Sequence, residues 1–321
     1  NGITGQEDKE AIQSEIESLK KEIDRISTST EFNTKNLLDG SLSTRVYADH
    51  VTRQMASKEV SVGKYDLTIT KAATPANIAF NNKAWDELAN PPHASGTVEI
   101  NGAVATIGEN MTAQEIYEEL RNAAEIGEAN ISEFGTSGEH VIVFESTAYG
   151  TNAELKITFS DDNLASFFGL SDKDNSAQGE DAQITLDRSS AFSNQATYST
   201  DGNKVTITDS GGFEISFLVE AGYQKDDSAI PKVDGIISLN VTDVGPMDLQ
   251  IGANEGQFMT VQIPAIDTEH MYIDDLDVTT VNGAKRALNK LTNALNYINM
   301  ARADLGAYQN RLESSGASLD E

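Results

Sequence analysis

Two segments with the apolar spacing of long helices stand at opposite ends of this 321-residue chain, and they constrain its fold more than any other feature. Between residues 7 and 27 the apolar residues follow steps of four and three, which places them on one stripe of a helix. The same steps recur over residues 284–313, where a helix would be about 45 Å long at 1.5 Å per residue. The stripe residues are Ile12, Ile16, Leu19, Ile23 and Ile26 at one end, and Leu288, Leu291, Leu295, Ile298, Ala301 or Arg302, Leu305, Tyr308 and Leu312 at the other.

Neither helix is apolar all round, so each must bury one stripe against another element. We expect the two helices to bury their stripes against each other, although they lie far apart in the sequence. Residues 1–60 and 243–321 would then form one discontinuous, coiled-coil-like helical domain, with the middle of the chain inserted into it.

The middle of the chain changes to a period of two, which is typical of strands with one buried face. Turn dipeptides such as Asn101-Gly102 and Asp201-Gly202 separate the alternating runs. One helix interrupts them, with Thr112 placed to cap it and Ile116 and Leu120 on one face. The alternating runs cover residues 65–70, 98–100, 141–144, 155–159, 184–186, 205–208 and 215–217.

This organisation predicts an α+β fold in which long terminal helices carry mostly antiparallel, β-rich outer domains. We expect one β-rich domain to be built from residues 61–95 and 177–242. An α+β unit at residues 96–176 would be inserted into it.

The charge balance excludes some partners. The chain has 51 acidic and 23 basic residues, a formal net charge of −28, so it repels nucleic acid and anionic membrane surfaces. Residues 61–242 hold 28 acidic against 10 basic residues, while the flanks hold 23 against 13. We therefore expect the middle to be the solvated outer part and the flanks to be the packed part.

The sequence offers no chemistry that indicates an enzyme. It has no cysteine, hence no disulfide or thiolate metal site, and no apolar run approaches the roughly 18 residues of a membrane span. Asp274-Asp275-Leu276-Asp277 lacks the glycine and closing glutamate of a calcium loop. Neither a nucleophile elbow nor a phosphate-binding loop occurs, so we predict no catalytic residue, no cofactor and no metal. The histidines stand in unrelated segments, where we expect surface positions: His50, His93, His140 and His270.

The flanks carry a family resemblance. The sequences EAIQSEI at residues 10–16, TEFN at 30–33 and NLLDG at 36–40 resemble the conserved core of bacterial flagellins. Residues 249–257 resemble the strand that re-enters that core, and 301–313 resemble its C-terminal helix. In the middle, residues 96–102, the helix around 114–122 and residues 141–155 resemble the hook "IN" motif of filament, cap and hook-associated proteins. Residues 181–187 are similar to a neighbouring cap-protein segment.

Three departures from the family are visible. Thr34 follows Asn33 where the family usually has glycine, and Gly316 stands where an apolar helix residue is usual, which suggests fraying there. The terminal polymerisation segments and the long first core helix of the family are also missing from this sequence. We therefore expect the chain to be soluble and monomeric, and unable to polymerise alone.

The resemblance implies a secreted, extracellular structural subunit of the flagellar filament, whose partners are other flagellin subunits. It also implies recognition by the vertebrate innate immune receptor Toll-like receptor 5. The positions that match receptor or filament contacts of the family are Ile12, Gln13, Glu15, Leu291, Leu295 and Arg311. The alternative for Ile12, Leu291 and Leu295 is a plain core role, because all three lie on the apolar stripes.

Two other functions stay open. The hook-motif resemblance is compatible with a filament-cap or hook–filament junction protein. The β-rich middle would also permit an adhesin-type or sugar-binding module, although the sequence has one tryptophan and no obvious aromatic cluster.

Overall fold

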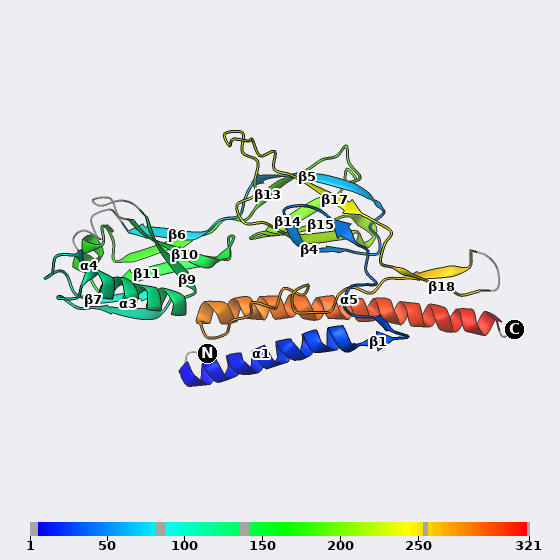
Figure 1. Ribbon diagram of the computed structural model, residues 1–321, viewed down its shortest axis with the longest axis horizontal. Coiled ribbons are helices and arrows are strands. Elements are labelled where there is room, and N and C mark those ends of the chain that lie inside the picture. The colour runs from blue at the N-terminus through cyan, green and yellow to red at the C-terminus, as the bar shows by residue number, and fades with distance from the viewer. Residues whose placement is uncertain (1–5, 81–87, 135–140, 253–255, 320–321) are drawn as a thin grey trace.

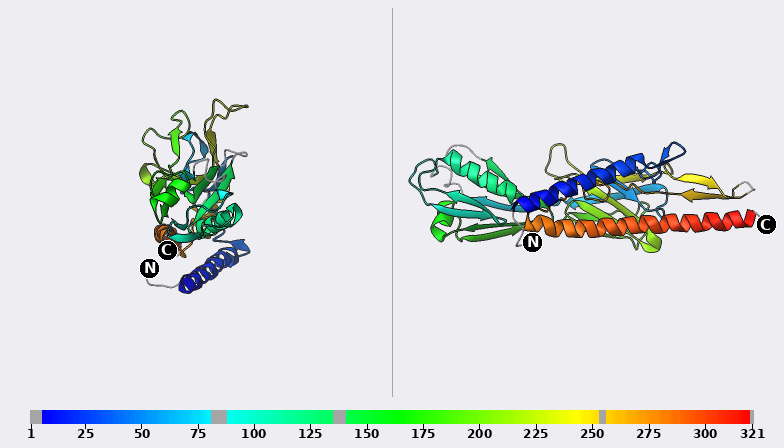
Figure 2. Two further views of the ribbon diagram at one scale, coloured as in Figure 1. Left: turned by 90° about the vertical axis from the view of Figure 1, so that its left-hand side faces the viewer. Right: turned by 90° about the horizontal axis from the view of Figure 1, so that it is seen from below.

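The computed structural model describes residues 6–80, 88–134, 141–252 and 256–319. Two helices from opposite ends of the chain, α1 (Gln6–Ser29) and α5 (Val281–Leu319), run in the same direction along one side of an elongated molecule (Figure 1). Two β-rich units stand in a row along the molecule, as Figure 2 also shows. The fold is α+β with antiparallel sheets, in agreement with the predicted class.

Helix α1 buries little of its predicted apolar stripe. Ile16 and Ile23 pack into a cluster with α5, whereas Ile12, Leu19 and Ile26, which are spaced by seven residues, stay exposed. The contact face of the helix is therefore partly polar, and position-specific hydrogen bonds must supplement apolar burial.

Helix α5 buries only part of its predicted stripe, with Ala301 buried and Ile298 and Tyr308 packed against apolar clusters. Ala287, Ala294 and Ala301, again spaced by seven residues, are buried, while Leu288 and Leu295 are exposed. Small side chains let a helix approach its neighbours closely, so the alanine face lies inward and the leucine face is left outside. The helix also continues through Gly316, where fraying was expected.

A third segment lies at the contact between α1 and α5. Residues 266–278 supply Ile266, Met271, Ile273, Leu276 and Val278 to the same cluster as Ile16, Ile23, Ala287 and Ala294. Within the described residues the two helices thus meet through an intervening segment, not as the direct coiled-coil pair that the stripes predicted. The physical reason is that neither helix turns its main leucine and isoleucine stripe toward the other.

Hydrogen bonds hold this intervening segment on α1. The side chain of Gln13 donates to the Leu276 carbonyl at 2.8 Å and accepts from the Val278 amide at 3.0 Å. About three helical turns further along α1, the Asp24 carboxylate accepts from the Thr268 amide at 2.8 Å and from its hydroxyl at 2.9 Å. The segment is consequently registered on α1 at two points.

The same segment is tied to the sheets and to α5. Arg53 donates to both carboxylate oxygens of Asp274, at 2.9 and 2.7 Å, in a two-pronged ion pair. The hydroxyl of Tyr297 on α5 donates to the Ala265 carbonyl at 3.0 Å. Residues 265–278 therefore bridge three parts of the molecule that the sequence separates widely.

The central β unit is a sandwich of two four-stranded sheets, ordered β13-β5-β17-β3 and β14-β15-β16-β4. Its core includes Leu67, Ile69, Phe217 and Leu239, each almost fully buried. The strands are β3 (Val46–Tyr47), β4 (Val51–Ala56), β5 (Gly63–Lys71), β13 (Gln183–Leu186), β14 (Thr197–Asp201), β15 (Lys204–Thr208), β16 (Glu214–Val219) and β17 (Ile236–Val241), with a 3-10 turn η1 (Ser210–Gly212).

The outer unit packs a helix on two further sheets, ordered β6-β10-β9 and β12-β11-β7-β8. Helix α3 (Ala113–Ile126) starts at a capping box between Thr112 and Glu115 and buries Ile116 and Leu120, as predicted. The remaining elements are β6 (Pro75–Phe80), β7 (Gly96–Ile100), β8 (Ala103–Ile107), β9 (Ala129–Phe134), β10 (Val141–Tyr149), β11 (Glu154–Phe159), α4 (Asp162–Phe167) and β12 (Asp174–Gln178).

The sheet boundaries differ from the predicted domain boundaries. Strand β4, expected in the helical domain, pairs with β16 of the sandwich, and β6, expected in the sandwich, pairs with β10 of the outer unit. Short strands of this kind carry little alternation of their own, and their partners lie over 60 residues away. The division into separate domains stays a prediction.

Two small hairpins complete the helical side of the molecule. β1 (Glu31–Phe32) pairs with β2 (Lys35–Asn36), and β18 (Met247–Gln250) pairs with β19 (Phe258–Val261). In the first hairpin Asn33 and Thr34 both have positive φ, 49° and 66°. The turn therefore keeps a left-handed geometry at Thr34, although that residue lacks the freedom of glycine.

Asp267 and His270 form a half-buried pair in the intervening segment, with Nδ1 of the imidazole 2.8 Å from both carboxylate oxygens. The hydrogen bond to Asp267 raises the pKa of His270 above its ordinary value of 6.5, against the effect of burial. Burial alone would raise the pKa of Asp267, but the bonds from His270 outweigh it and hold that pKa below 3.8. Both groups are therefore charged at mildly acidic pH.

This pair predicts a pH-dependent stability. Because the pKa of His270 is raised on folding, its contribution is complete below about pH 6.5 and is lost as the pH rises through the raised pKa. The Asp267 contribution is lost only at the acid end, as the pH falls through its lowered pKa. Thermal unfolding followed from pH 5 to pH 9 should show this loss in the native chain, and His270→Gln should remove it.

The matched control is His93→Gln, because His93 lies beside the carbonyl oxygens of Ala94 and Met111 at 3.0 Å each. That variant should keep the pH dependence of the native chain. An unfolding temperature with the same pH slope in His270→Gln and in the native chain would contradict the assignment.

Candidate functional site

The three predicted contact residues of α1 have different environments. Ile12 is 43% exposed, and Glu15 is also exposed, so both side chains are available to a partner. Gln13 is half-buried, and its amide is engaged by Leu276 and Val278. The structure therefore gives Gln13 an internal role, because its side chain holds residues 276–278 against α1.

The three predicted contact residues of α5 are all exposed. Leu291 is 39% exposed, Leu295 is 61% exposed, and Arg311 stands in an exposed stretch of the helix. The alternative that Ile12, Leu291 and Leu295 are core residues is wrong. The buried face of α5 is occupied by the alanines at 287, 294 and 301, and the leucine face points away from it.

Five of the six positions lie toward one end of the helical side. Ile16 on α1 and Ala294 on α5 share one apolar cluster, and the predicted residues stand within about one helical turn of these two. Arg311 follows Leu295 by 16 residues, a separation of about 24 Å along a helix. The structure thus groups Ile12, Glu15, Leu291 and Leu295 near one another along the helices and leaves Arg311 apart.

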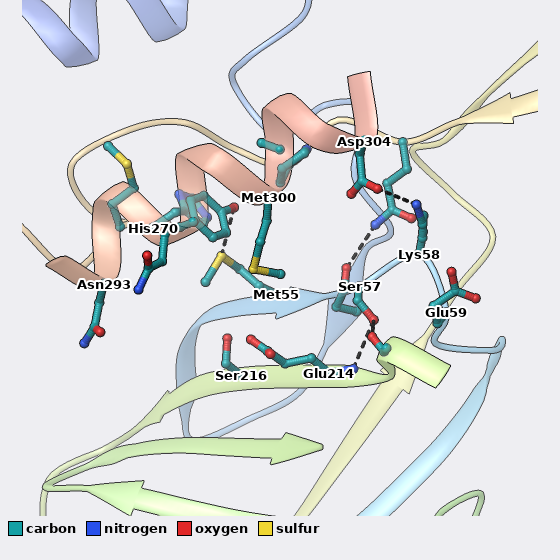
Figure 3. A pocket seen from close by; sticks show the side chains of 18 of the residues that line it. Met55, Ser57, Lys58, Glu59, Glu214, Ser216, His270, Asn293, Met300 and Asp304 are labelled. Carbon is teal, nitrogen blue, oxygen red and sulfur yellow. Dashed lines mark hydrogen bonds and ion pairs between the residues drawn. The ribbon is translucent and has the colours of Figure 1, made fainter. Parts of the chain in front are cut away.

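A cavity of about 420 Å³ lies between the sandwich and α5. Met55 from β4 and Met300 from α5 point toward each other across it (Figure 3). The Tyr297 hydroxyl contacts the Met55 sulfur at 3.3 Å, and an ion pair between Lys58 and Asp304 stands at one side. The cavity is therefore part of the joint between the sandwich and the helix.

The polar groups around this cavity are used structurally. The Ser57 hydroxyl donates to the Gly212 carbonyl and accepts from the Glu214 amide, which ties β4 to the turn before β16. Lys204 lies over the ring of Tyr272 at 4.0 Å, and burial lowers the pKa of its ammonium group. These contacts describe a packed joint and present no nucleophile with a hydrogen-bonded base.

Three histidines fall in the described part of the chain, while His140 lies outside it. His50 is at the surface beside Glu220, as expected, whereas His93 and His270 are half-buried. Over the described ranges, no group of three or more histidine, aspartate or glutamate side chains could hold a metal ion. None of the described helices is long and apolar enough to cross a membrane.

The acidic run at residues 274–277 is occupied by protein partners. Asp274 pairs with Arg53, Asp275 with Lys290 at 2.6 Å, and Asp277 accepts from the Thr279 amide at 2.7 Å. Each carboxylate stabilises a different contact of the intervening segment, so the run is a structural turn.

Sequence reasoning missed the residues that join the parts of the molecule. Arg53, Tyr297 and the alanine face of α5 all act at this joint, and only the alanines carry a sequence signal, their spacing of seven. The leucines next to these alanines made their spacing hard to recognise, because a larger apolar side chain is the stronger indicator of burial.

Comparisons with known proteins point to one family. Residues 1–43 match the bacterial flagellin N-terminal helical region. Flagellin A of Vibrio cholerae is 31% identical over 127 residues, which is 39% of this chain and 27% of that protein. Flagellin D of Vibrio cholerae is 26% identical over 214 residues, 56% of this chain and 52% of that protein.

Solved structures of flagellar proteins are also similar. The D1-D2-D3 domains of the flagellar cap protein FliD from Escherichia coli share 15% identity, with a TM-score of 0.41 over 88% of this chain and 82% of that one. The matched part of the chain spans 61% of the length of one curated relative and 27% of another. The match to the N-terminal helical region and the similarity to several flagellins identify bacterial flagellins as the family that this chain resembles.

Proposed function

We propose that this protein is a structural subunit of the flagellar filament, outside the cell, and that it acts by packing against other subunits. The observation that carries the proposal is the exposed apolar face of the two helices. It comprises Ile12, Leu19 and Ile26 on α1, and Leu288, Leu291, Leu295, Leu305 and Leu312 on α5.

This face is unusual for a solvated surface. Large apolar side chains scattered singly are normal on proteins, but regular rows along two helices mark contact surfaces. The acidic β-rich units lie to one side of α1 and α5 (Figure 1), so they would project from the packed helices. A role in assembly uses both features, and the chain offers no catalytic arrangement in its described part that would favour an enzyme.

The experiment that tests this proposal is immunogold labelling of cells that make the protein, with antibodies raised against the chain. A filament subunit should be labelled along the whole filament. Labelling confined to the tip would indicate a cap protein, and labelling confined to the base would indicate a junction protein. Either confined pattern would reject the proposal.

We predict that Leu295→Asp, introduced into the complete flagellar protein, shortens or abolishes the filaments. An unpaired polar group buried at a contact costs about 1–3 kcal/mol, so the buried carboxylate should weaken each contact roughly 5- to 150-fold. Filament length by electron microscopy and swimming in soft agar measure the effect.

The matched control is Val62→Asp, because Val62 is 64% exposed in the loop before β5 of the sandwich. Both variants should fold by circular dichroism, since both positions are exposed. Equal filament loss in the two variants, or none in Leu295→Asp, would argue against packing through the leucine face.

We further propose that the helical side is recognised by Toll-like receptor 5, as the family resemblance implies. Glu15 and Arg311 are the exposed charged positions that support this part, because both are open to a partner and lie on different helices. Gln13 is the weakest of the six positions for a direct contact, since its amide holds residues 276–278.

Direct binding of the chain to the receptor ectodomain should detect this interaction. Loss of one exposed ion-pair partner typically costs up to about 1 kcal/mol, so Glu15→Ala and Arg311→Ala should each weaken binding up to roughly fivefold. Lys21→Ala, at another exposed position of α1, is the control and should bind like the native chain. Absence of binding by a folded chain would refute the receptor proposal and leave the filament role intact.

A further inference from the structure

The sandwich carries a hollow on the outer face of β17. Ile236, Ser238 and Asn240 alternate along this strand and share its outer face, while Ile237 and Leu239 between them are buried in the core. The hollow has a volume of about 510 Å³. This lies within the range of about 300–1,000 Å³ that is typical of small-molecule sites.

Three aromatic rings border the hollow. Tyr47 stands on β3 directly opposite Asn240 and is 52% exposed. The rings of His50 and Tyr223 are stacked, with centroids 4.0 Å apart and planes within 10° of parallel. The Tyr223 hydroxyl donates to the Ile236 carbonyl at 2.9 Å, which fixes its ring against β17. The aromatic cluster that the sequence did not reveal is therefore assembled from two segments, residues 47–50 and the loop that holds Tyr223.

The backbone at His50 is held in a special conformation. Its φ is 61°, in the left-handed region that residues other than glycine rarely adopt. The Glu220 amide donates to the His50 carbonyl at 2.9 Å, and the Glu220 carboxylate lies 2.8 Å from Nδ1 of the ring. Local strain of this kind is concentrated at binding sites, where surrounding contacts hold the geometry ready.

The polar groups of the hollow are oxygens and amides. Asp49, Asp234, Ser238 and Asn240 line it, and the described lining includes no lysine or arginine. Burial, together with the carboxylates of Asp234 and Asp49, raises the pKa of Tyr223, so the ring lies in a negative field. An anionic ligand is disfavoured here. The hollow suits a neutral ligand that carries many hydroxyl groups and one apolar face.

A hexose in its ring form has this chemistry. Its hydroxyls donate to carboxylates and exchange hydrogen bonds with serine and amide groups, and its C–H face packs on aromatic rings. Carboxylates accept such bonds more strongly than neutral oxygens do. An exposed tyrosine therefore offers a ring for the C–H face of the sugar, and two aspartates and an asparagine beside it offer partners for the sugar hydroxyls.

We propose that this hollow binds a neutral hexose unit of a glycan, with Tyr47 as the stacking ring and Asp234, Asp49 and Asn240 as hydroxyl partners. The site stands on the sandwich and shares no residue with the exposed helical faces, so it is independent of the filament role. Glycan binding would give the outer part of the protein an attachment function.

Saturation-transfer NMR on the full chain tests the proposal, with the methyl glycosides of galactose, glucose and mannose as probes. At least one of the three should receive saturation from the protein, and Tyr47→Ala and Asn240→Ala should each weaken its binding roughly tenfold. Tyr198→Ala is the matched control, because Tyr198 is a 44% exposed tyrosine on β14 of the other sheet, and it should bind like the native chain.

Two further probes distinguish other ligand classes. N-acetylneuraminic acid, an anionic sugar, should not bind, and choline tests for an organic cation at the aromatic and acidic groups. The proposal is overturned if no neutral glycoside binds to the folded chain, or if only choline binds. It is also overturned if neither Tyr47→Ala nor Asn240→Ala, both folded by circular dichroism, weakens glycoside binding.

Discussion

The arrangement of this molecule depends on the hydrogen bonds that hold residues 265–278 against helix α1. Helix α1 turns a partly polar face inward, so apolar burial alone would not fix its rotation or its height. Gln13 and Asp24 fix the position of the helix instead, through hydrogen bonds to the backbone of residues 265–278. Buried backbone groups need such partners. Arg53 and Tyr297 then connect the same segment to the sandwich and to α5.

The β-rich units are held to α5 and to each other by separate contacts. An ion pair between Glu128, just after α3, and Arg286 joins the outer unit to the start of the helix. A second contact joins the outer unit to the sandwich. The Asp181 carboxylate accepts from the amide of Thr151, just after β10, and from the amide of Gly202, just after β14, at 3.0 and 2.8 Å. The outer unit is thus tied at two distant points, which fixes its direction relative to the helical side (Figure 1).

The exposed faces of the helices and the hollow on β17 differ in the chemistry of their side chains. Rows of leucine and isoleucine suit a broad apolar contact with another protein, whereas the rings and acids around Tyr47 suit a small polar ligand. Because the two surfaces share no residue, assembly and ligand binding would not compete. The alanine stripe of α5 makes this possible, since it meets the packing needs of the molecule and leaves the larger apolar side chains available.

The sequence by itself determined the helices at both ends, the strands with clear alternation, and the helix capped by Thr112, because periodicity and capping are local properties. It also placed Ile12, Glu15, Leu291 and Leu295 on the terminal helices, where the structure shows all four exposed. Only the tertiary structure decided which stripe of each helix is buried, where β4 and β6 pair, and that Tyr47, His50 and Tyr223 meet. Those outcomes depend on contacts between residues far apart in the chain, and an apolar stripe indicates burial without naming the partner that provides it.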